Sequence, residues 1–189
     1  MGSGPGVSCA VTLNTTLTPE ERRLYQDPRT IQRLLREART IAIVGLSTDP
    51  QRASWFVGNY LQQEGYRIVP IHPTATAVLG ERAYADLRQV PDPIDIVDVF
   101  RPPSEALGIA RQAVDAGAKA FWMQLKLADM DAAALARKAG LTVVADRCIK
   151  MEHGRYSGRL HWAGMNTEII SARKARLHPA GRAVRTRAG

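Results

Sequence analysis

The sequence predicts an α/β protein in which a doubly wound, parallel, five-stranded sheet is covered by helices on both faces. Apolar segments of four to seven residues alternate with amphipathic segments between positions 40 and 145. Three amphipathic segments end in glycine, at Gly65, Gly117 and Gly140, and an apolar segment begins within about two residues of each. Near-continuous apolar strands are typical of parallel sheets buried on both faces, and glycine is favoured where a helix ends.

Two short helices are expected before the first strand. Thr18-Pro19-Glu20-Glu21 provides a capping hydroxyl, a first-turn proline and a carboxylate at the third helical position, and Asp27-Pro28 repeats the signal. The predicted strands are 41–44, 67–71, 94–100, 119–124 and 141–145, and the predicted helices between them are 54–64, a short one near 84–89, 103–116 and 129–139. We expect the strand order 3-2-1-4-5. Residues 151–170 are read as either a hairpin or a helix at the sheet edge.

The length of 189 residues suits a single domain with flexible tails. We expect a flexible leader at 1–17, the folded domain at 18–170 and a disordered basic tail at 171–189. No apolar run approaches the 18 residues of a membrane span, and the first ten residues lack the pattern of a secretory signal. Two cysteines, Cys9 and Cys148, make no disulfide framework, so a reducing, cytoplasmic location is expected.

The net charge of +8 is concentrated in the tail. Residues 171–189 contain six Lys or Arg side chains and no carboxylate, which leaves +2 for the rest of the chain. Such a segment is typical of a solvated appendage, and this disfavours a specific nucleic-acid interface. Salt-sensitive attachment of the tail to nucleic acid stays open as an alternative.

The loop after the first predicted strand is the first candidate site. In a doubly wound sheet the ligand crevice lies beyond the carboxyl ends of the strands where the winding reverses, here expected between the first and fourth strands. Gly45 would let a ligand approach the backbone, Ser47 and Ser54 supply hydroxyls, and Arg52 can bind a phosphate with two parallel hydrogen bonds. The loop lacks the G-x-G-x-x-G fingerprint of dinucleotide folds. Capping of a turn and a helix by the two serines is the alternative role.

The end of the second predicted strand discriminates between ligands. A dinucleotide fold usually places Asp or Glu there to bind the ribose hydroxyls, whereas this chain has no carboxylate between Glu64 and Glu81. His72 stands near that place, although a purely structural loop histidine is equally compatible with the pattern. Together with Gly45 and Arg101, it predicts a cationic, carboxylate-free pocket that tolerates a phosphorylated ribose.

Two further groups of residues were weighed as sites. Cys148, Glu152 and His153 fit no structural zinc spacing and lack a further ligand, so no metal is expected. Asp95 and Asp98 are separated by an odd number of positions in a strand and therefore lie on opposite faces. We expect them to bond helix ends or solvent at the sheet rim rather than to act as a catalytic pair.

Taken together, these segments resemble the small stand-alone bacterial coenzyme A-binding proteins, whose domain is similar to the CoA-binding domain of the succinyl-CoA synthetase α subunit. The stretches that carry the resemblance are Ile43-Val44-Gly45-Leu46-Ser47 with Pro50, Arg52 and Ser54; Gly65-Tyr66-Arg67-Ile68-Val69-Pro70-Ile71-His72-Pro73; Asp95-Ile96-Val97-Asp98-Val99-Phe100-Arg101-Pro102; Ala116-Gly117-Ala118-Lys119-Ala120-Phe121-Trp122-Met123-Gln124; Ala139-Gly140-Leu141-Thr142-Val143-Val144 with Asp146-Arg147-Cys148; and Trp162-Ala163-Gly164-Met165-Asn166-Thr167. They follow the family order over about residues 20–172.

The resemblance implies a Rossmann-like domain that binds CoA or an acyl-CoA as its cofactor. The cofactor-binding residues it implies are Gly45, Leu46, Ser47, Arg52, Ser54, Ile71, His72, Pro73, Phe100, Arg101, Trp122, Gln124 and Lys126. The family usually has Asn at the place of His72 and Gly at the place of Lys126. No catalytic or metal-binding residue is expected, so the sequence predicts a binding protein without chemistry of its own.

Several alternatives remain open at this point. The fold also permits an NAD(P)-dependent oxidoreductase, although the glycine fingerprint and the strand-end acid are missing. The chain could instead serve an acyl-CoA synthetase-like complex whose ATP-binding domain lies on a partner chain. A mixed disulfide between Cys148 and the CoA thiol is a further option. Homodimerisation is compatible with the sequence, and no membrane partner is expected.

Overall fold

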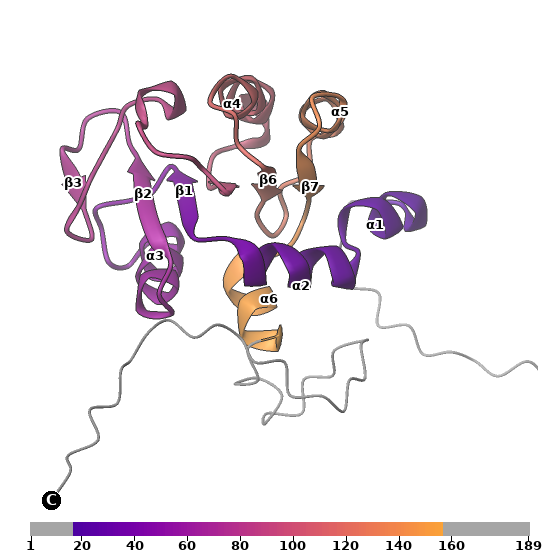
Figure 1. The fold of residues 1–189 in the computed structure, drawn as a ribbon, viewed down its shortest axis with the longest axis horizontal. Coiled ribbons are helices and arrows are strands. Elements are labelled where there is room, and N and C mark those ends of the chain that lie inside the picture. Colours follow the sequence, from indigo (N-terminus) through magenta and orange to yellow (C-terminus); the bar gives the residue numbers. More distant parts are fainter. Residues whose placement is uncertain (1–16, 157–189) are drawn as a thin grey trace, which may run out of the picture.

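The structure, a computed structural model, describes residues 17–156. Its elements follow one another along the chain as Figure 1 shows. They are α1 (Pro19–Tyr25), α2 (Pro28–Glu37), β1 (Thr40–Val44), α3 (Ala53–Gln63), β2 (Arg67–Ile71), β3 (Ala77–Val78), β4 (Glu81–Arg82), η1 (Leu87–Gln89), β5 (Ile96–Val99), α4 (Pro103–Asp115), β6 (Ala120–Met123), α5 (Met130–Lys138), β7 (Thr142–Val144) and α6 (Ile149–Tyr156). Each strand of the predicted sheet is present, with ends that differ by no more than two residues.

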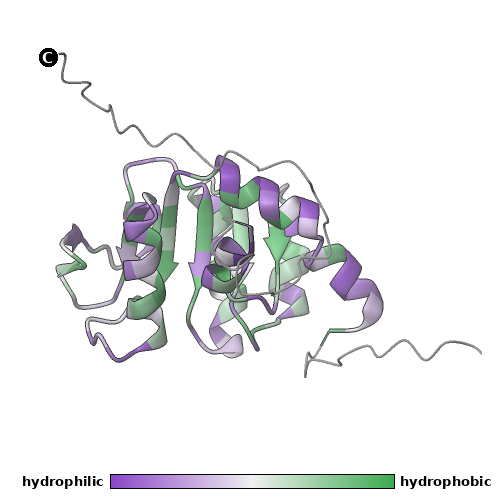
Figure 2. Cartoon of the chain, turned by 90° about the horizontal axis from the view of Figure 1, so that it is seen from below, coloured by the Kyte–Doolittle hydropathy of each residue, from purple (hydrophilic) through white to green (hydrophobic). Residues whose placement is uncertain are grey.

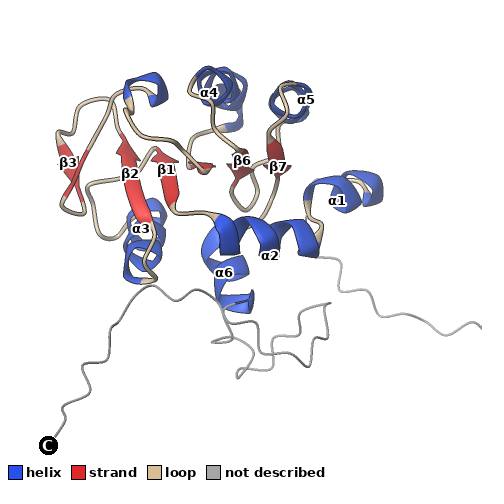
Figure 3. Ribbon diagram, in the orientation of Figure 1, coloured by secondary structure: helices blue, strands red, loops and turns tan. Residues whose placement is uncertain are grey.

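Five of these strands form one parallel sheet in the order β2-β1-β5-β6-β7, which confirms the doubly wound α/β class (Figure 3). Counting only these five strands along the chain, the order is 2-1-3-4-5. The expected 3-2-1-4-5 order put the third strand outside the second, whereas the structure puts it beside the first. The winding reverses next to β1 in both orders, so the crevice stays at β1, but its second wall is β5.

The outer edge of β2 carries an isolated β-bridge. The backbone N–H of Tyr84 donates to the Pro70 carbonyl (3.0 Å), and the Tyr84 carbonyl accepts from the N–H of His72 (2.9 Å). This bridge takes up part of the outer edge of β2, and β5 pairs with β1 on the other side of β1. The chain reaches Tyr84 through the β3–β4 hairpin, whose turn residues Leu79 and Gly80 have φ of 57° and 78°. Strands of two residues are too short to show an alternation of apolar and polar residues, so the hairpin was not predicted.

Helices cover both faces of the sheet. In Figure 1, α4 and α5 lie above the sheet, and α2, α3 and α6 lie below it. Val97 and Phe121 pack against α4 and α5 on one face, and Ile43 and Trp122 pack against α2, α3 and α6 on the other. Figure 2 shows mainly apolar strands between helices that carry polar residues on their outer sides. Burial on both faces accounts for the near-continuous apolar runs.

The helix ends match the local signals in the sequence. At α1 the Glu21 N–H donates to Thr18 Oγ1 (3.2 Å) and the Thr18 N–H donates to Glu21 Oε2 (2.7 Å), which forms a capping box. At α2 the Thr30 N–H donates to the Asp27 carboxylate (2.8 Å). The glycines that end the three later helices have left-handed φ values: Gly65 at 97°, Gly117 at 67° and Gly140 at 91°. These predictions are confirmed.

Several sequence predictions fall on residues outside the described range. They concern the leader up to residue 16, the stretch 162–167 and the basic tail at 171–189. Within the range, α6 makes positions 151–156 helical, which favours the helix of the two readings for that part. None of the helices between residues 17 and 156 combines the length and apolarity needed to cross a membrane.

Candidate functional site

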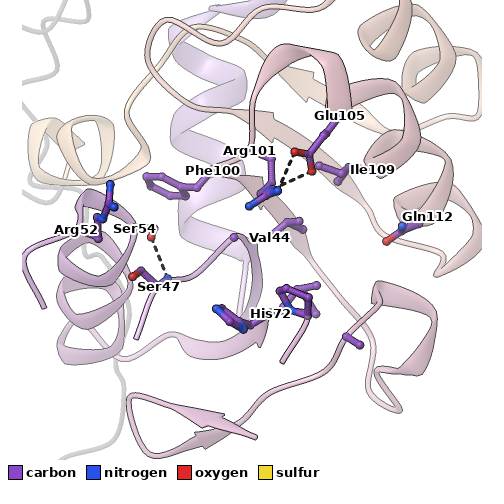
Figure 4. A pocket seen from close by; sticks show the side chains of 14 residues that line it. Val44, Ser47, Arg52, Ser54, His72, Phe100, Arg101, Glu105, Ile109 and Gln112 are labelled. Atoms are coloured by element: carbon purple, nitrogen blue, oxygen red, sulfur yellow. Dashed lines mark hydrogen bonds and ion pairs between the residues drawn. The ribbon is translucent and has the colours of Figure 1, made fainter. Parts of the chain in front are cut away.

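A pocket of about 550 Å³ lies at the carboxyl ends of β2, β1 and β5, where the winding reverses. Its size is in the range of small-molecule sites. Figure 4 shows Arg52 and Ser54 on one side and Gln112 on the other, with His72 and Phe100 between them. The lining residues are Val44, Gly45, Ser47, Arg52, Ser54, Ile71, His72, Pro73, Ala85, Phe100, Arg101, Glu105, Ile109 and Gln112.

The structure brings nine of the thirteen predicted site residues together in this pocket. They are Gly45, Ser47, Arg52, Ser54, Ile71, His72, Pro73, Phe100 and Arg101. They come from the carboxyl ends of three neighbouring parallel strands and from the first turn of α3. Contact between these residues and a ligand stays a prediction.

Gly45 is required by a close approach within the protein itself. Its φ is +85°, and a Cβ at this position would lie 2.8 Å from Arg101 Cδ and 2.9 Å from the Phe100 carbonyl oxygen. The stem of Arg101 therefore occupies the side of Gly45 where a Cβ would lie, while Gly45 itself lines the pocket, and approach of a ligand to its backbone stays a prediction.

The loop between β1 and α3 satisfies several of its own N–H groups. The Ser47 N–H donates to Ser54 Oγ (3.0 Å), and the Asp49 N–H donates to Ser47 Oγ (3.0 Å). Each serine thus has the capping role considered above, while its hydroxyl hydrogen is still able to donate. The first turn of α3 has no side-chain cap at its N-cap residue, Arg52. The positive end of this helix therefore faces the pocket with the Arg52 side chain, which is 75% exposed.

Arg101 forms a bidentate ion pair with Glu105, four residues on in α4. Arg101 Nε donates to Glu105 Oε2 and Arg101 Nη2 donates to Glu105 Oε1, both at 2.8 Å. This hydrogen bonding lowers the pKa of Glu105. Because both residues line the pocket, the prediction of a carboxylate-free pocket was wrong. The prediction rested on the residues at the strand ends, whereas Glu105 lies in the first turn of the following helix, α4.

The imidazole of His72 is held in one tautomer by the backbone. Its Nδ1 accepts from the N–H of Ala75 (2.9 Å) and from the N–H of Thr74 (3.2 Å). Nδ1 therefore carries a lone pair and the ring hydrogen lies on Nε2, where it is a donor. His72 thus combines a structural role in its loop with one N–H group at the pocket.

Four predicted site residues lie outside the pocket lining. Leu46 and Trp122 are fully buried in the core on the α3 side of the sheet. Gln124 is buried and donates through Nε2 to Asp98 Oδ1 (2.7 Å). Lys126 is exposed, with a φ of 66° and its backbone N–H on Asp146 Oδ1 (2.6 Å). The corrected strand order explains these positions in part, since β6 is separated from β1 by β5.

Five lining residues were missed by the sequence reasoning. They are Val44, Ala85, Glu105, Ile109 and Gln112. The last three are spaced four and three positions apart in α4, a pattern that places them on one side of a helix. This spacing was visible in the sequence, but the expected site between the first and fourth strands gave no reason to examine it.

The group Cys148, Glu152 and His153 lies in or next to α6, on the side of the sheet that α2 and α3 cover. Glu152 binds Arg155 (2.7 Å), and His153 Nδ1 shares a hydrogen bond with the Tyr60 hydroxyl (2.8 Å). Burial raises the pKa of the Cys148 thiol, which lowers its thiolate fraction and disfavours disulfide exchange.

Asp95 lies at the sheet rim, bonded to Lys119 (2.7 Å), as expected. Asp98 does not lie at the rim, because it is fully buried in β5.

A doubly wound sheet with a polar pocket at its winding reversal defines an α/β ligand-binding domain. Residues 39–154 match the model of a family described as a CoA binding domain, and the chain belongs to that family. The resemblance drawn from the sequence is thereby confirmed. The protein YneT of Bacillus subtilis (strain 168) is 38% identical over 123 residues, which span 65% of this chain and 91% of YneT.

Solved structures share the fold. A hypothetical protein from Pyrococcus horikoshii OT3 superposes with a TM-score of 0.66 at 36% identity, covering 68% of this chain and 90% of the other. The apo form of a dinucleotide-forming acetyl-coenzyme A synthetase from Ca. Korarchaeum cryptofilum superposes with a TM-score of 0.54 at 24% identity. That match covers 61% of this chain and 28% of the synthetase, and it shows a common fold alone.

Proposed function

We propose that this protein binds coenzyme A or an acyl-CoA in the pocket at the ends of β1, β2 and β5 and performs no chemistry on it. The observation that carries the proposal is the open N-terminus of α3. Its uncapped first turn, the Ser54 hydroxyl and the Arg52 guanidinium face one pocket in a chain of the CoA binding domain family. A helix N-terminus with a nearby cation is suited to bind a phosphate.

The composition of the lining supports binding of an anionic nucleotide. Arg52, Arg101 and the Nε2–H of His72 are all donors, and Arg side chains match phosphate oxygens with two parallel bonds. The end of β2 carries His72 where dinucleotide-binding folds use an acid. A ribose phosphate is therefore accepted there without repulsion.

The state of the same side chains supports the absence of chemistry. Within the pocket lining the titratable candidates for acid or base roles are Glu105 and His72. Nδ1 of His72 is held by two backbone N–H groups, and Glu105, whose pKa is lowered by its hydrogen bonds from Arg101, is paired with that arginine unless a ligand phosphate replaces it. A general base needs a free lone pair within reach of the substrate, and these contacts engage the basic atoms.

Calorimetric titration with CoA, dephospho-CoA, NAD and NADP tests the proposal. We expect CoA to bind about tenfold or more tightly than dephospho-CoA, because a hydrogen-bonded charged group contributes about 1.5–3 kcal/mol. Equal affinity for the two would remove the role of the ribose phosphate. Tighter binding of NADP than of CoA would favour a nicotinamide-dependent function instead.

The assignment to this pocket is tested separately with Arg52→Gln. Loss of one cation at the open helix end should weaken CoA binding several-fold without changing the melting temperature, since the side chain is 75% exposed. Arg36→Gln is the matched control. It removes an exposed arginine from α2, outside the pocket lining, and should leave CoA affinity unchanged.

A further inference from the structure

The ion pair between Arg101 and Glu105 occupies the donors that a ligand phosphate would use. Two parallel N–H···O bonds of 2.8 Å join the guanidinium to the carboxylate. Arginine uses the same bidentate geometry to bind phosphate groups. In this structure the carboxylate of Glu105 therefore takes the place on Arg101 that is suited to a ligand phosphate.

The stem of Arg101 lies over Gly45. Its stem passes so close to Gly45 that a Cβ there would lie 2.8 Å from Cδ and 3.3 Å from Cγ. The ion pair with Glu105 lies beyond this part of the side chain. The Glu105 carboxylate holds only the guanidinium end of the side chain.

The pair is also accessible to a competitor. The side chains of Arg101 and Glu105 are 44% and 43% exposed, and ion pairs at such positions contribute little net free energy. A phosphate monoester carries close to two negative charges at pH 7 against one for a carboxylate. An incoming phosphate is therefore the stronger partner for the guanidinium.

We propose that Glu105 is an internal competitor for Arg101, which a phosphate of the bound ligand displaces. The proposal rests on the proposed function and adds a specificity role for Glu105. Every ligand that places a phosphate on Arg101 must first displace the Glu105 carboxylate, which costs the same free energy in each case. Groups with less negative charge do not displace the carboxylate. The pocket thus selects for charge at this place.

The test is calorimetric titration of wild type and Glu105→Gln with CoA and dephospho-CoA. Removal of the competitor should tighten CoA binding about two- to fivefold, the range expected for an exposed pair. A gain for CoA alone assigns the ribose phosphate to Arg101. An equal gain for both ligands would mean that the singly charged phosphates of the pyrophosphate suffice, and it overturns the selection for charge. Unchanged or weaker CoA binding by Glu105→Gln overturns the proposal.

Two controls separate competition from a general charge effect. Arg101→Met keeps an unbranched stem over Gly45 without the guanidinium, and in that background Glu105→Gln should bring no gain. Asp131→Asn removes another exposed carboxylate, in the first turn of α5 and outside the pocket lining, and should also bring none. A gain that persists without Arg101 overturns the proposal.

The outcomes also separate this inference from the proposed function. If wild type binds CoA and Glu105→Gln gains nothing, only this inference fails. If no variant binds CoA, the proposed function fails with it.

Discussion

The two halves of the sheet's carboxyl edge differ in how their loops meet. At the ends of β2, β1 and β5 the loops diverge and leave a pocket of about 550 Å³. At the ends of β6 and β7 the loops bind one another. The Lys126 N–H donates to Asp146 Oδ1 (2.6 Å), the Asp146 N–H donates to the Leu127 carbonyl (3.0 Å), and Trp122 Nε1 donates to the Arg147 carbonyl (2.7 Å). We call these regions the open half and the closed half.

The direction of winding accounts for the difference. After β1 the chain moves outward to β2 over one face, and after β2 it returns to β5 over the other, so the loops at β1 and β5 lead to opposite faces. From β5 to β7 the strands follow in one direction, and successive loops lie side by side. A crevice therefore forms at the reversal and not beyond it. In the open half an exposed donor side chain such as Arg52 lines a pocket, whereas the polar groups of the closed half named above are bonded to one another.

The largest expected effect comes from Asp98, which is buried beside the closed half. Its Oδ1 accepts from Gln124 Nε2 (2.7 Å), and among the described residues its Oδ2 has no hydrogen-bond partner. Burial raises the pKa of Asp98 from 3.8 to about 8. Between these two values the folded protein keeps a proton that the unfolded chain loses, so stability falls as pH rises. The slope approaches 1.4 kcal/mol per pH unit.

Asp98→Asn should remove this dependence, since an amide does not titrate and its oxygen can still accept from Gln124. The stability of the variant relative to wild type, measured by urea unfolding, should increase from pH 5 to pH 8. Asp95→Asn is the matched control with the opposite sign. Bonds from Lys119 and from the N–H groups of Thr40 and Arg39 outweigh burial and lower the pKa of Asp95. The stability that ionised Asp95 contributes to the fold is fully present above the ordinary aspartate pKa of 3.8 and is lost as the pH falls below it. A pH-independent difference for Asp98→Asn would contradict the assignment.

The next effect is at Gly45 in the open half. Gly45→Ala places a Cβ at a φ of +85°, 2.9 Å from a backbone carbonyl oxygen and 2.8 Å from Arg101 Cδ. We expect a loss of about 2–4 kcal/mol, from the left-handed backbone together with overpacking. Displacement of Arg101 should weaken CoA binding at the same time.

Gly117→Ala is the control for the backbone contribution. Gly117 has a φ of +67°, and no atom lies within 4 Å of a Cβ built there. Its substitution should cost about 1–2 kcal/mol without a change in CoA affinity. Chemical denaturation of the two variants measures the difference. Equal losses would mean that the contact between Gly45 and Arg101 is unimportant.

The contrast between the halves also explains what the sequence could predict. Strand and helix positions followed from local signals, such as the apolar run at β1 and the capping residues Thr18 and Asp27. Strand order depended on a distant pairing, that of β5 with β1. No local pattern records that pairing, and the predicted order therefore placed the fourth strand beside the first.

The candidate site was predicted best where it depends on strand ends alone. His72 and Arg101 stand at the ends of β2 and β5, and parallel strands bring such positions to one edge. Gln124 also follows a strand end, but its side chain turns inward to Asp98. Glu105 could not be found from strand ends, since it reaches the pocket from α4. Which polar group stays available thus depends on the side-chain bonds of the folded state.

The smallest expected effect concerns the loop that His72 organises in the open half. His72→Ala removes the acceptor for the N–H groups of Thr74 and Ala75 and should cost about 1 kcal/mol. His72→Asn should cost less than half of that, because an amide oxygen two bonds from Cβ can accept the same N–H groups, as in an Asx turn. Urea unfolding measures both losses of stability, and titration with CoA measures whether the Nε2–H of His72 contributes to ligand affinity. If the ring acts only through Nδ1, Asn restores stability and CoA affinity together. If the Nε2–H contacts the ligand, Asn restores stability while CoA affinity stays below that of wild type.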